Sequence, residues 1–391
     1  MSHFVFITLL AAFPALSTDM YLPALPIIQE QMGIPLATAN LSLVLFFVFF
    51  SFSLLIYGPL SDRVGRRPVL LGGITIYILG SLLCALSQSI WLLVIARIIQ
   101  AAGAASASAL SMALAKDLYT GAERQKVLAY MGVIVPLCPM LAPLFGSFVL
   151  EFASWHWIFV CQAVLATLAM YGSITFDEPE FEKIRGSVWK VVSRYSAVLS
   201  NVPFSLSCFT FSFMGIGFFG FLAGSADIYI LSYGLTEQEY AIFFGFNALG
   251  FMLGSFLCSR LCIGMTSMEI LQGSLLGILV SSIALFFFGH TAIGFAITMF
   301  FMTFSIGVSR PVSNHMILET VDSDVGTAAS ILTFTYFILG AFAMQFISFD
   351  WVSKSAVISQ MGIAAAIIPL VALLFMRRKH KLAHQVEQEQ E

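Results

Sequence analysis

Long apolar runs dominate this sequence and constrain its fold more than any other feature. A helix needs about 20 mostly apolar residues to cross a bilayer, and helices satisfy every backbone polar group within lipid. Twelve runs meet this requirement, near 5–27, 39–59, 69–88, 91–115, 127–150, 156–176, 203–225, 238–259, 268–288, 292–316, 326–348 and 356–376. Charged residues make up only 10% of the chain, against about a quarter in soluble domains. The predicted fold class is an all-α integral membrane protein with twelve transmembrane helices.

The basic residues follow an alternating pattern that predicts the orientation of these spans. Cytoplasmic loops carry an excess of Lys and Arg. Fifteen of the 18 basic residues fall in the even-numbered connections and the C-terminal tail, namely Arg63, Arg66, Arg67, Lys116, Arg124, Lys126, Lys183, Arg185, Lys190, Arg194, Arg260, Arg377, Arg378, Lys379 and Lys381. Lys354 falls in an opposite loop, while Arg97 and Arg310 lie inside spans. Both termini are therefore expected on the cytoplasmic side.

A polar connection divides the spans into two groups of six. The predicted units are an N-terminal six-helix bundle (1–176), an inter-bundle linker (177–202), a C-terminal six-helix bundle (203–376) and a tail (377–391). The linker segment Phe181–Tyr195 mixes apolar and charged residues, which is typical of a helix lying on the membrane surface.

Weak internal similarity indicates that the two halves are repeats. Ser17–Leu22 in the first span resembles Ser225–Ile230 in the seventh, at an offset of 208 residues. The same offset carries Arg97 to within a few residues of Arg310. Parallel repeats of six spans are a known transporter plan, with the substrate site between them near the midplane. We therefore expect two pseudo-symmetric bundles.

The loop between the second and third spans carries the most specific motif. Its sequence, Gly-Pro-Leu-Ser-Asp-Arg-Val-Gly-Arg-Arg-Pro over 58–68, resembles the signature loop of the major facilitator superfamily. The resemblance implies a conformational latch at the inner ends of neighbouring helices, formed with a carboxylate of span four. The predicted latch residues are Gly58, Asp62, Arg63, Gly65, Arg66, Arg67 and Asp117. A solvated turn that only obeys the positive-inside rule is the alternative.

Two further strings resemble motifs of the same superfamily. One of them begins with Arg97 in the fourth span. A charged residue inside a span is costly, which predicts a functional role for Arg97. The alternative is that its side chain snorkels to the membrane interface. The fifth span carries Pro139, Pro143 and Gly146 in a string that resembles the antiporter motif, with Ala142 where glycine is usual. The resemblance favours exchange of two solutes.

Asp19 is the carboxylate that lies well inside a first-half span. The surrounding string, Leu-Ser-Thr-Asp-Met-Tyr-Leu-Pro over 16–23, resembles the first-span motif of twelve-span drug:proton antiporters of the Bcr/CflA-like branch. The resemblance implies that Asp19, with Arg97, couples proton movement to substrate. The alternative is that Asp19 is a structural cap, which forms a hydrogen bond with Tyr21 or with the backbone where the helical hydrogen bonding is interrupted before Pro23.

Four residues are predicted to line the substrate cavity: Tyr21, Asp227, Arg310 and Asn314. Asp227 lies near the outer boundary of its span, and the alternative, that it is a loop residue, is equally consistent with the sequence. Arg310 lies deeper, beside Pro311, and is expected to face the cavity, pair with an acid, or bind an anionic group of the substrate.

These features together predict a proton-coupled exporter of small drug-like or amphipathic compounds, working by alternating access. Export of one dedicated carboxylated metabolite, such as a siderophore-like compound, is the alternative. A membrane enzyme or a channel is disfavoured because neither a catalytic constellation nor a filter-like loop is found. The expected setting is a monomer in the bacterial inner membrane, in contact with lipid and a small substrate. Neither a cofactor, a metal nor nucleic acid is expected, and the proton gradient is the energy source.

Overall fold

The computed structural model describes residues 3–176, 178 and 188–388, nearly all of them helical. The first half contains α1 (His3–Asp19), η1 (Leu22–Ala24), α2 (Leu25–Met32), α3 (Leu36–Val64), α4 (Arg66–Ala85), α5 (Ile90–Leu118), α6 (Gly121–Phe152) and α7 (His156–Thr175). The second half contains α9 (Val202–Ser212), η2 (Phe213–Gly215), α10 (Ile216–Ala226), η3 (Asp227–Ser232), α11 (Glu237–Leu261), α12 (Ser267–Phe288), α13 (Ala292–Leu318), α14 (Val325–Ile347) and α15 (Lys354–Gln388). Between them lies α8 (Val188–Ser200).

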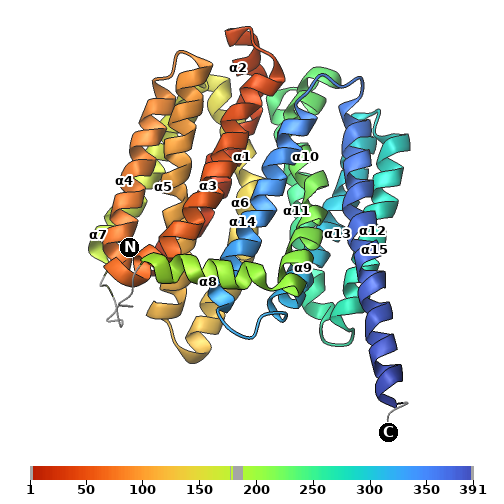
Figure 1. The fold of residues 1–391 in the computed structure, drawn as a ribbon. Coiled ribbons are helices and arrows are strands. Elements are labelled where there is room, and N and C mark those ends of the chain that lie inside the picture. The colour runs from red at the N-terminus through yellow and green to blue at the C-terminus, as the bar shows by residue number, and fades with distance from the viewer. Residues whose placement is uncertain (1–2, 177, 179–187, 389–391) are drawn as a thin grey trace.

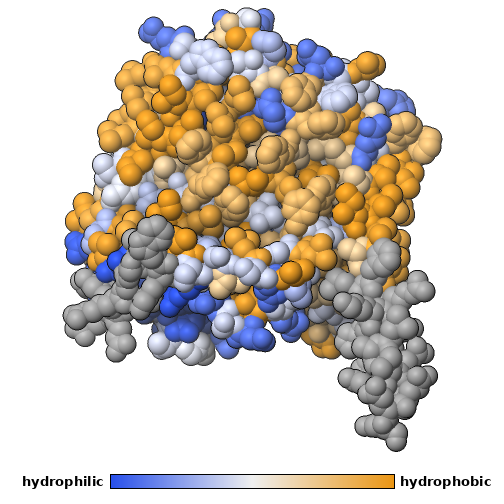
Figure 2. All heavy atoms as spheres, in the orientation of Figure 1, coloured by the Kyte–Doolittle hydropathy of each residue, from blue (hydrophilic) through white to orange (hydrophobic). Residues whose placement is uncertain are grey.

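The predicted fold class is confirmed, because each of the twelve apolar runs falls on a helical segment. Among the described residues, eleven segments are long and apolar enough to cross a membrane. The twelfth is α6, which has 32 residues and an apolar stretch at Leu137–Phe152. Figure 2 shows apolar residues in a broad band across the face in view, with hydrophilic residues gathered mainly at its two ends. This is the surface that a bilayer requires.

The helices form two groups that meet along two pairs of helices. Within the first group α5 packs against α1, α3 and α4, and within the second α13 packs against α11 and α12. Between the groups, α6 packs against α11 and α3 packs against α14. Figure 1 shows α8 lying across one end of the molecule, where both described chain ends also lie. We call this the basic end, because it carries Arg66, Lys116, Arg124 and Arg194.

The linker helix α8 connects both groups at the basic end. Tyr195 donates a hydrogen bond to the carbonyl of Leu55 in α3 (3.0 Å). On the other side, Arg194 lies 3.7 Å from Asp324, just before α14. A surface helix was expected over Phe181–Tyr195; the part of that range before Val188 lies outside the described residues.

The spans that correspond by the 208-residue offset both depart from α-helical geometry at an aspartate. α1 ends at Asp19 and continues as the short 3₁₀ segment η1, because Pro23 has no N–H to offer and fixes its own φ. In the seventh span, α10 ends just before Asp227, and η3 continues as a π-helical turn. Helix irregularities of this kind occur often at functional sites.

Glycine allows α4 and α5 to approach each other at backbone contact. A Cβ atom on Gly103 would lie 2.3 Å from the backbone nitrogen of Tyr77 and 2.6 Å from the carbonyl oxygen of Gly73. Such distances are far inside van der Waals contact, so any side chain here forces the helices apart. Small residues drive helix association in membranes for this reason.

We expect Gly103→Ala to destabilise the protein by about 1–3 kcal/mol, the usual cost of overpacking. Thermal melting in detergent measures the effect. Gly72→Ala is the control, since a Cβ on Gly72, also in α4, meets nothing within 4 Å. Equal melting temperatures for the two variants would contradict the prediction.

Candidate functional site

Asp19 occupies the break in the first span. Its side chain is only 5% exposed and accepts a hydrogen bond from the Thr18 hydroxyl (2.8 Å). Among the residues that the structure describes, no basic group lies within ion-pair distance of it. A negative charge in such surroundings is costly, because neither water nor a cation compensates it. The geometry suits a carboxyl group that gains and loses a proton.

Arg97 acts on the backbone before Asp19 rather than on its carboxylate. It is completely buried, and its Nη1 atom donates to the carbonyl oxygen of Ser17 (2.8 Å) and to the side chain of Gln100 (2.6 Å). Its guanidinium carbon lies 4.2 Å from the ring centroid of Phe46. The last carbonyls of a helix lack partners within the helix, and their partial negative charge attracts a cation. Arg97 therefore caps the C-terminus of α1, and it does not snorkel.

Further polar residues complete this cap, and sequence reasoning missed them. Gln162 in α7 donates to the carbonyl oxygen of Leu16 (3.0 Å) and accepts from Gln100 (2.8 Å). The hydroxyl groups of Tyr77 and Ser17 share a hydrogen bond of 2.7 Å. The available signal was an amide within an apolar run, since polar side chains in membrane spans commonly bond across helices.

The antiporter-like string packs directly against the residue that follows Asp19. A Cβ atom on Gly146 in α6 would lie 2.1 Å from the carbonyl oxygen of Met20. Pro143 is buried and Pro139 is partly buried. The motif therefore brings α6 onto the break in α1, while α6 also packs against α11 of the other half. Movement of α6 is in this way connected to the surroundings of Asp19.

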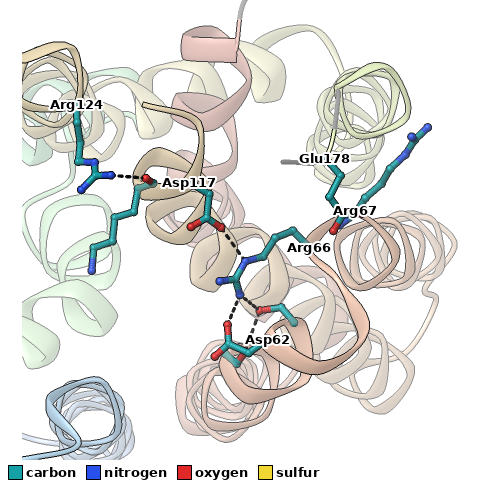
Figure 3. A network of polar contacts seen from close by, with 9 residues as sticks. Asp62, Arg66, Arg67, Asp117, Arg124 and Glu178 are labelled. Carbon is teal, nitrogen blue, oxygen red and sulfur yellow. Dashed lines mark hydrogen bonds and ion pairs between the residues drawn. The ribbon is translucent and has the colours of Figure 1, made fainter. Parts of the chain in front are cut away.

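The latch predicted at the basic end is assembled around Arg66. Its Nη1 atom lies 2.5 Å from Asp62 and 2.6 Å from the Ser61 hydroxyl, and its Nε atom lies 3.0 Å from Asp117 at the end of α5 (Figure 3). The Asp62 and Asp117 side chains are 39% and 25% exposed. Partly exposed ion pairs contribute at most about 1 kcal/mol each, so this network can break and re-form.

Gly65 gives the latch loop its shape. Its φ of 127° and ψ of 154° lie in a region that is essentially restricted to glycine. A Cβ here would also lie 2.9 Å from Glu178, whose carboxylate accepts from the backbone N–H of Arg67 (3.1 Å) (Figure 3). The Arg67 side chain donates to the carbonyl of Ile174. Glu178 is a further residue that the sequence did not reveal.

Other predicted latch residues contribute no side chain to this network. In the described part of the chain, the side chain of Arg63 makes none of these bonds, while Gly58 takes part only through its backbone carbonyl, which accepts from the Ser61 hydroxyl (2.9 Å). Arg124, at the start of α6, extends the network by donating to the carbonyl of Lys116 (2.8 Å) (Figure 3).

Asp227 forms an ion pair, whereas Asp19 forms none with the described residues. Its carboxylate lies 2.6 Å from the ammonium group of Lys354 at the start of α15, and the two side chains are 9% and 14% exposed. Lys354 is the basic residue that departs from the charge alternation, and the ion pair accounts for its position. Asp227 was expected to line the substrate cavity or lie in a loop; the structure places it in a buried ion pair within the second half.

The remaining cavity candidates are placed differently. Tyr21 is completely buried, and its hydroxyl shares a 2.8 Å hydrogen bond with Ser42 of α3. Arg310 is partly exposed, and its guanidinium carbon lies 3.4 Å from the ring centroid of Tyr336 in α14. Asn314 follows one turn later in α13. Of this group, Arg310 and Asn314 are brought together, and Tyr21 belongs instead to the surroundings of Arg97.

Comparison with known proteins decides the family. The family model described as Major Facilitator Superfamily matches residues 7–344. The chain belongs to the major facilitator superfamily. It is a transporter rather than an enzyme, and the membership predicted from the loop motif is confirmed.

Several relatives and one solved structure resemble this transporter. The transporter YdgK of Bacillus subtilis is 35% identical over 64% of each chain. The bicyclomycin resistance protein homolog of Haemophilus influenzae is 26% identical over 97% of this chain and 98% of its own, in agreement with the Bcr/CflA-like branch. The chloramphenicol resistance protein of Pseudomonas aeruginosa is 27% identical over 83% of this chain and 78% of its own. The crystal structure of a D-xylose–proton symporter shares the fold, with a TM-score of 0.72, 16% identity and coverage of 95% and 96% of the two chains.

We expect Gly65→Ala to slow transport by roughly an order of magnitude, because it forces about 1–3 kcal/mol of backbone strain into the latch. Transport rates in everted vesicles, normalised to the amount of protein, measure the effect. Gly58→Ala in the same loop is the control, since a Cβ there meets nothing within 4 Å. A Gly65→Ala variant that transports at the rate of the control would show that the loop conformation is unimportant.

Breaking the ion pair between Asp227 and Lys354 should lower the stability of the protein. Lys354→Met leaves an unpaired buried carboxylate and should cost about 3–5 kcal/mol. The double variant Asp227→Asn, Lys354→Met should recover most of this loss, because no charge is left buried. Thermal melting of the single and double variants in detergent makes the comparison. The interpretation fails if Lys354→Met melts like the unmodified protein.

Proposed function

We propose that this transporter exports small drug-like or amphipathic compounds in exchange for protons, by alternating access. The observation that carries the proposal is Asp19, a buried carboxylate without a cationic partner among the described residues, at a helix break. Protonation removes its charge, and an incoming cationic or polar compound can replace the proton. The names of the relatives, which refer to resistance to bicyclomycin and chloramphenicol, support drug-like substrates.

Alternating access requires contacts that hold the halves together at one end and release at the other. At the end opposite the basic end, the Asn40 side chain of α3 donates to the carbonyl of Ala223 (3.1 Å) and to the Ser348 hydroxyl (2.7 Å). These bonds join the first half to α10 and to the end of α14. At the basic end the corresponding contacts are those of α8, which bonds Leu55 in the first half and pairs with Asp324 in the second, whereas the latch around Arg66 lies within the first half. We propose that transport alternates between breaking the Asn40 contacts and breaking those at the basic end.

The proposed setting is a monomer in the bacterial inner membrane, with the basic end and both termini in the cytoplasm. The positive-inside rule supports this orientation, and the relatives come from bacteria. The energy source is the proton gradient, without a cofactor. One proton moving inward supplies about 2.3 kcal/mol per 100 mV and about 1.4 kcal/mol per pH unit, which is enough to build a substantial substrate gradient.

Asp19→Asn should abolish proton-driven efflux while leaving part of the substrate binding intact, because the amide keeps the shape of the carboxyl group and cannot carry the proton. The measurement is uptake of a fluorescent drug into everted vesicles, with and without a proton gradient. Asp322→Asn is the control, since Asp322 is an exposed carboxylate in the loop before α14. Unchanged proton-driven uptake in the Asp19→Asn variant would contradict proton coupling through Asp19.

A further inference from the structure

The two arginines that lie within spans of the repeat have different surroundings. Arg97 is completely buried and its guanidinium is held by the Ser17 carbonyl and Gln100. Arg310, in the corresponding span of the second half, is partly exposed. Across the residues that the structure describes, its guanidinium makes neither an ion pair nor a hydrogen bond, and its central carbon lies 3.4 Å from the ring centroid of Tyr336. An arginine in a membrane span normally finds an anion or a carbonyl.

The protein supplies no counter-ion to Arg310 from the helices around it. α13, which carries Arg310, and α9 and α14, which pack against it, contain no Asp or Glu, and the Glu residues of α11 and α12, which also pack against α13, lie in the first turns of those helices. Of the carboxylates nearer the basic end, Asp324 lies 3.7 Å from Arg194, Glu319 lies 3.2 Å from His315, and Asp322 is exposed in the loop before α14. One turn from Arg310, the side-chain oxygen of Asn314 is buried without a hydrogen-bond donor among the described residues.

The guanidinium of Arg310 lies over the Tyr336 ring, and its N–H donors form no hydrogen bond with the residues that the structure describes. A guanidinium is planar, and its N–H donors point outward in that plane. When one face lies on Tyr336, the edge that can form two parallel hydrogen bonds with a carboxylate remains available. Gly215 makes room for Tyr336 at this position, because a Cβ there would lie 2.3 Å from its ring.

Aromatic rings connect Arg310 to the interface between the two halves. Tyr336 packs against Phe219 and Phe337, with ring centroids 5.0 and 5.8 Å apart. Phe337 in turn stacks on Phe47 of α3 in the first half, at 5.5 Å. Since α3 and α14 are one of the two helix pairs that join the halves, the arginine lies behind a surface that opens when the halves separate. An apolar compound that passes between the halves meets these rings first.

We propose that Arg310, packed on Tyr336, and Asn314 form a subsite that recognises a carboxylate group of the transported compound. The substrate class is a small aromatic or apolar compound with a carboxylate and a neighbouring hydrogen-bond donor, such as a hydroxyl or amide N–H. The carboxylate takes the edge of the guanidinium, the donor binds the Asn314 oxygen, and the apolar body lies on the aromatic surface. This proposal depends on the proposed function in one respect: the compound that binds the subsite is a compound that the protein transports.

The test compares two probes that differ in charge and little in shape, 4-hydroxybenzoate and 4-hydroxybenzamide. Binding to the purified full-length protein in detergent is measured at pH 7 by equilibrium dialysis and by thermal shift, without a proton gradient. We expect the unmodified protein to bind the carboxylate at least about tenfold more tightly than the amide, as a charge-assisted bidentate contact provides. Arg310→Gln should remove this preference, and Arg310→Lys, which keeps the charge but loses the planar fork, should reduce it.

Arg260→Gln is the matched control, because Arg260 also lies over an aromatic ring, 5.5 Å from the centroid of Phe256, and is exposed at the basic end. It should keep the full preference for the carboxylate. If Arg310→Gln does not fold, the reduced preference of Arg310→Lys carries the test. An unmodified protein without a preference, or a preference that persists in both Arg310 variants, overturns the proposal. Because no gradient is used, Asp19→Asn should retain the preference, so loss of proton coupling and loss of the anion subsite are separate results.

Discussion

The hydrogen bonds that Arg97 and Gln162 donate to the end of α1 hold the central part of this structure together. A bilayer offers no water to the carbonyls that a helix break exposes, so side chains must bind them. Arg97 and Gln162 come from two different helices and donate to the carbonyls of Ser17 and Leu16, and Gln100 connects them by accepting from Arg97 and donating to Gln162. The carboxyl group of Asp19 is thereby left at a rigid break, next to the point where α6 reaches Met20 through Gly146.

The two halves share a plan and have diverged in their charges. Asp19 and Asp227 stand at matching breaks, but Lys354 neutralises Asp227. Arg97 is bonded to a helix end, whereas the guanidinium of Arg310 lies over the Tyr336 ring and forms no ion pair with the described residues. The first half has an ionic latch around Arg66, whereas the matching turn of the second half is closed by a capping box between Thr266 and Glu269. The first half thus holds a buried carboxylate without an ion pair among the described residues and an ionic network around Arg66, whereas the second half holds an ion pair at its matching aspartate.

Much of the fold and part of the site could be predicted from the sequence. The spans follow from hydrophobicity, which is local, and the loop at 58–68 is specific enough to indicate the family. The sequence also singled out Asp19, Arg97 and Arg310, because a charge within an apolar run is costly wherever its partner lies. It could not reveal Tyr77, Gln162 or Glu178, whose importance comes from residues 60 to 146 positions away in the chain.

The sequence by itself determined that this chain crosses the membrane twelve times, belongs to a transporter family and carries a few costly charges inside its spans. The tertiary structure alone decided what each charge does. Asp19 and Asp227 lie in similar strings, yet one is free of ion pairs among the described residues and the other is bound to Lys354 across 127 positions of sequence. The reason is physical: burial depends on local composition, whereas the free energy of a buried charge depends on which distant group the fold brings within about 4 Å of it.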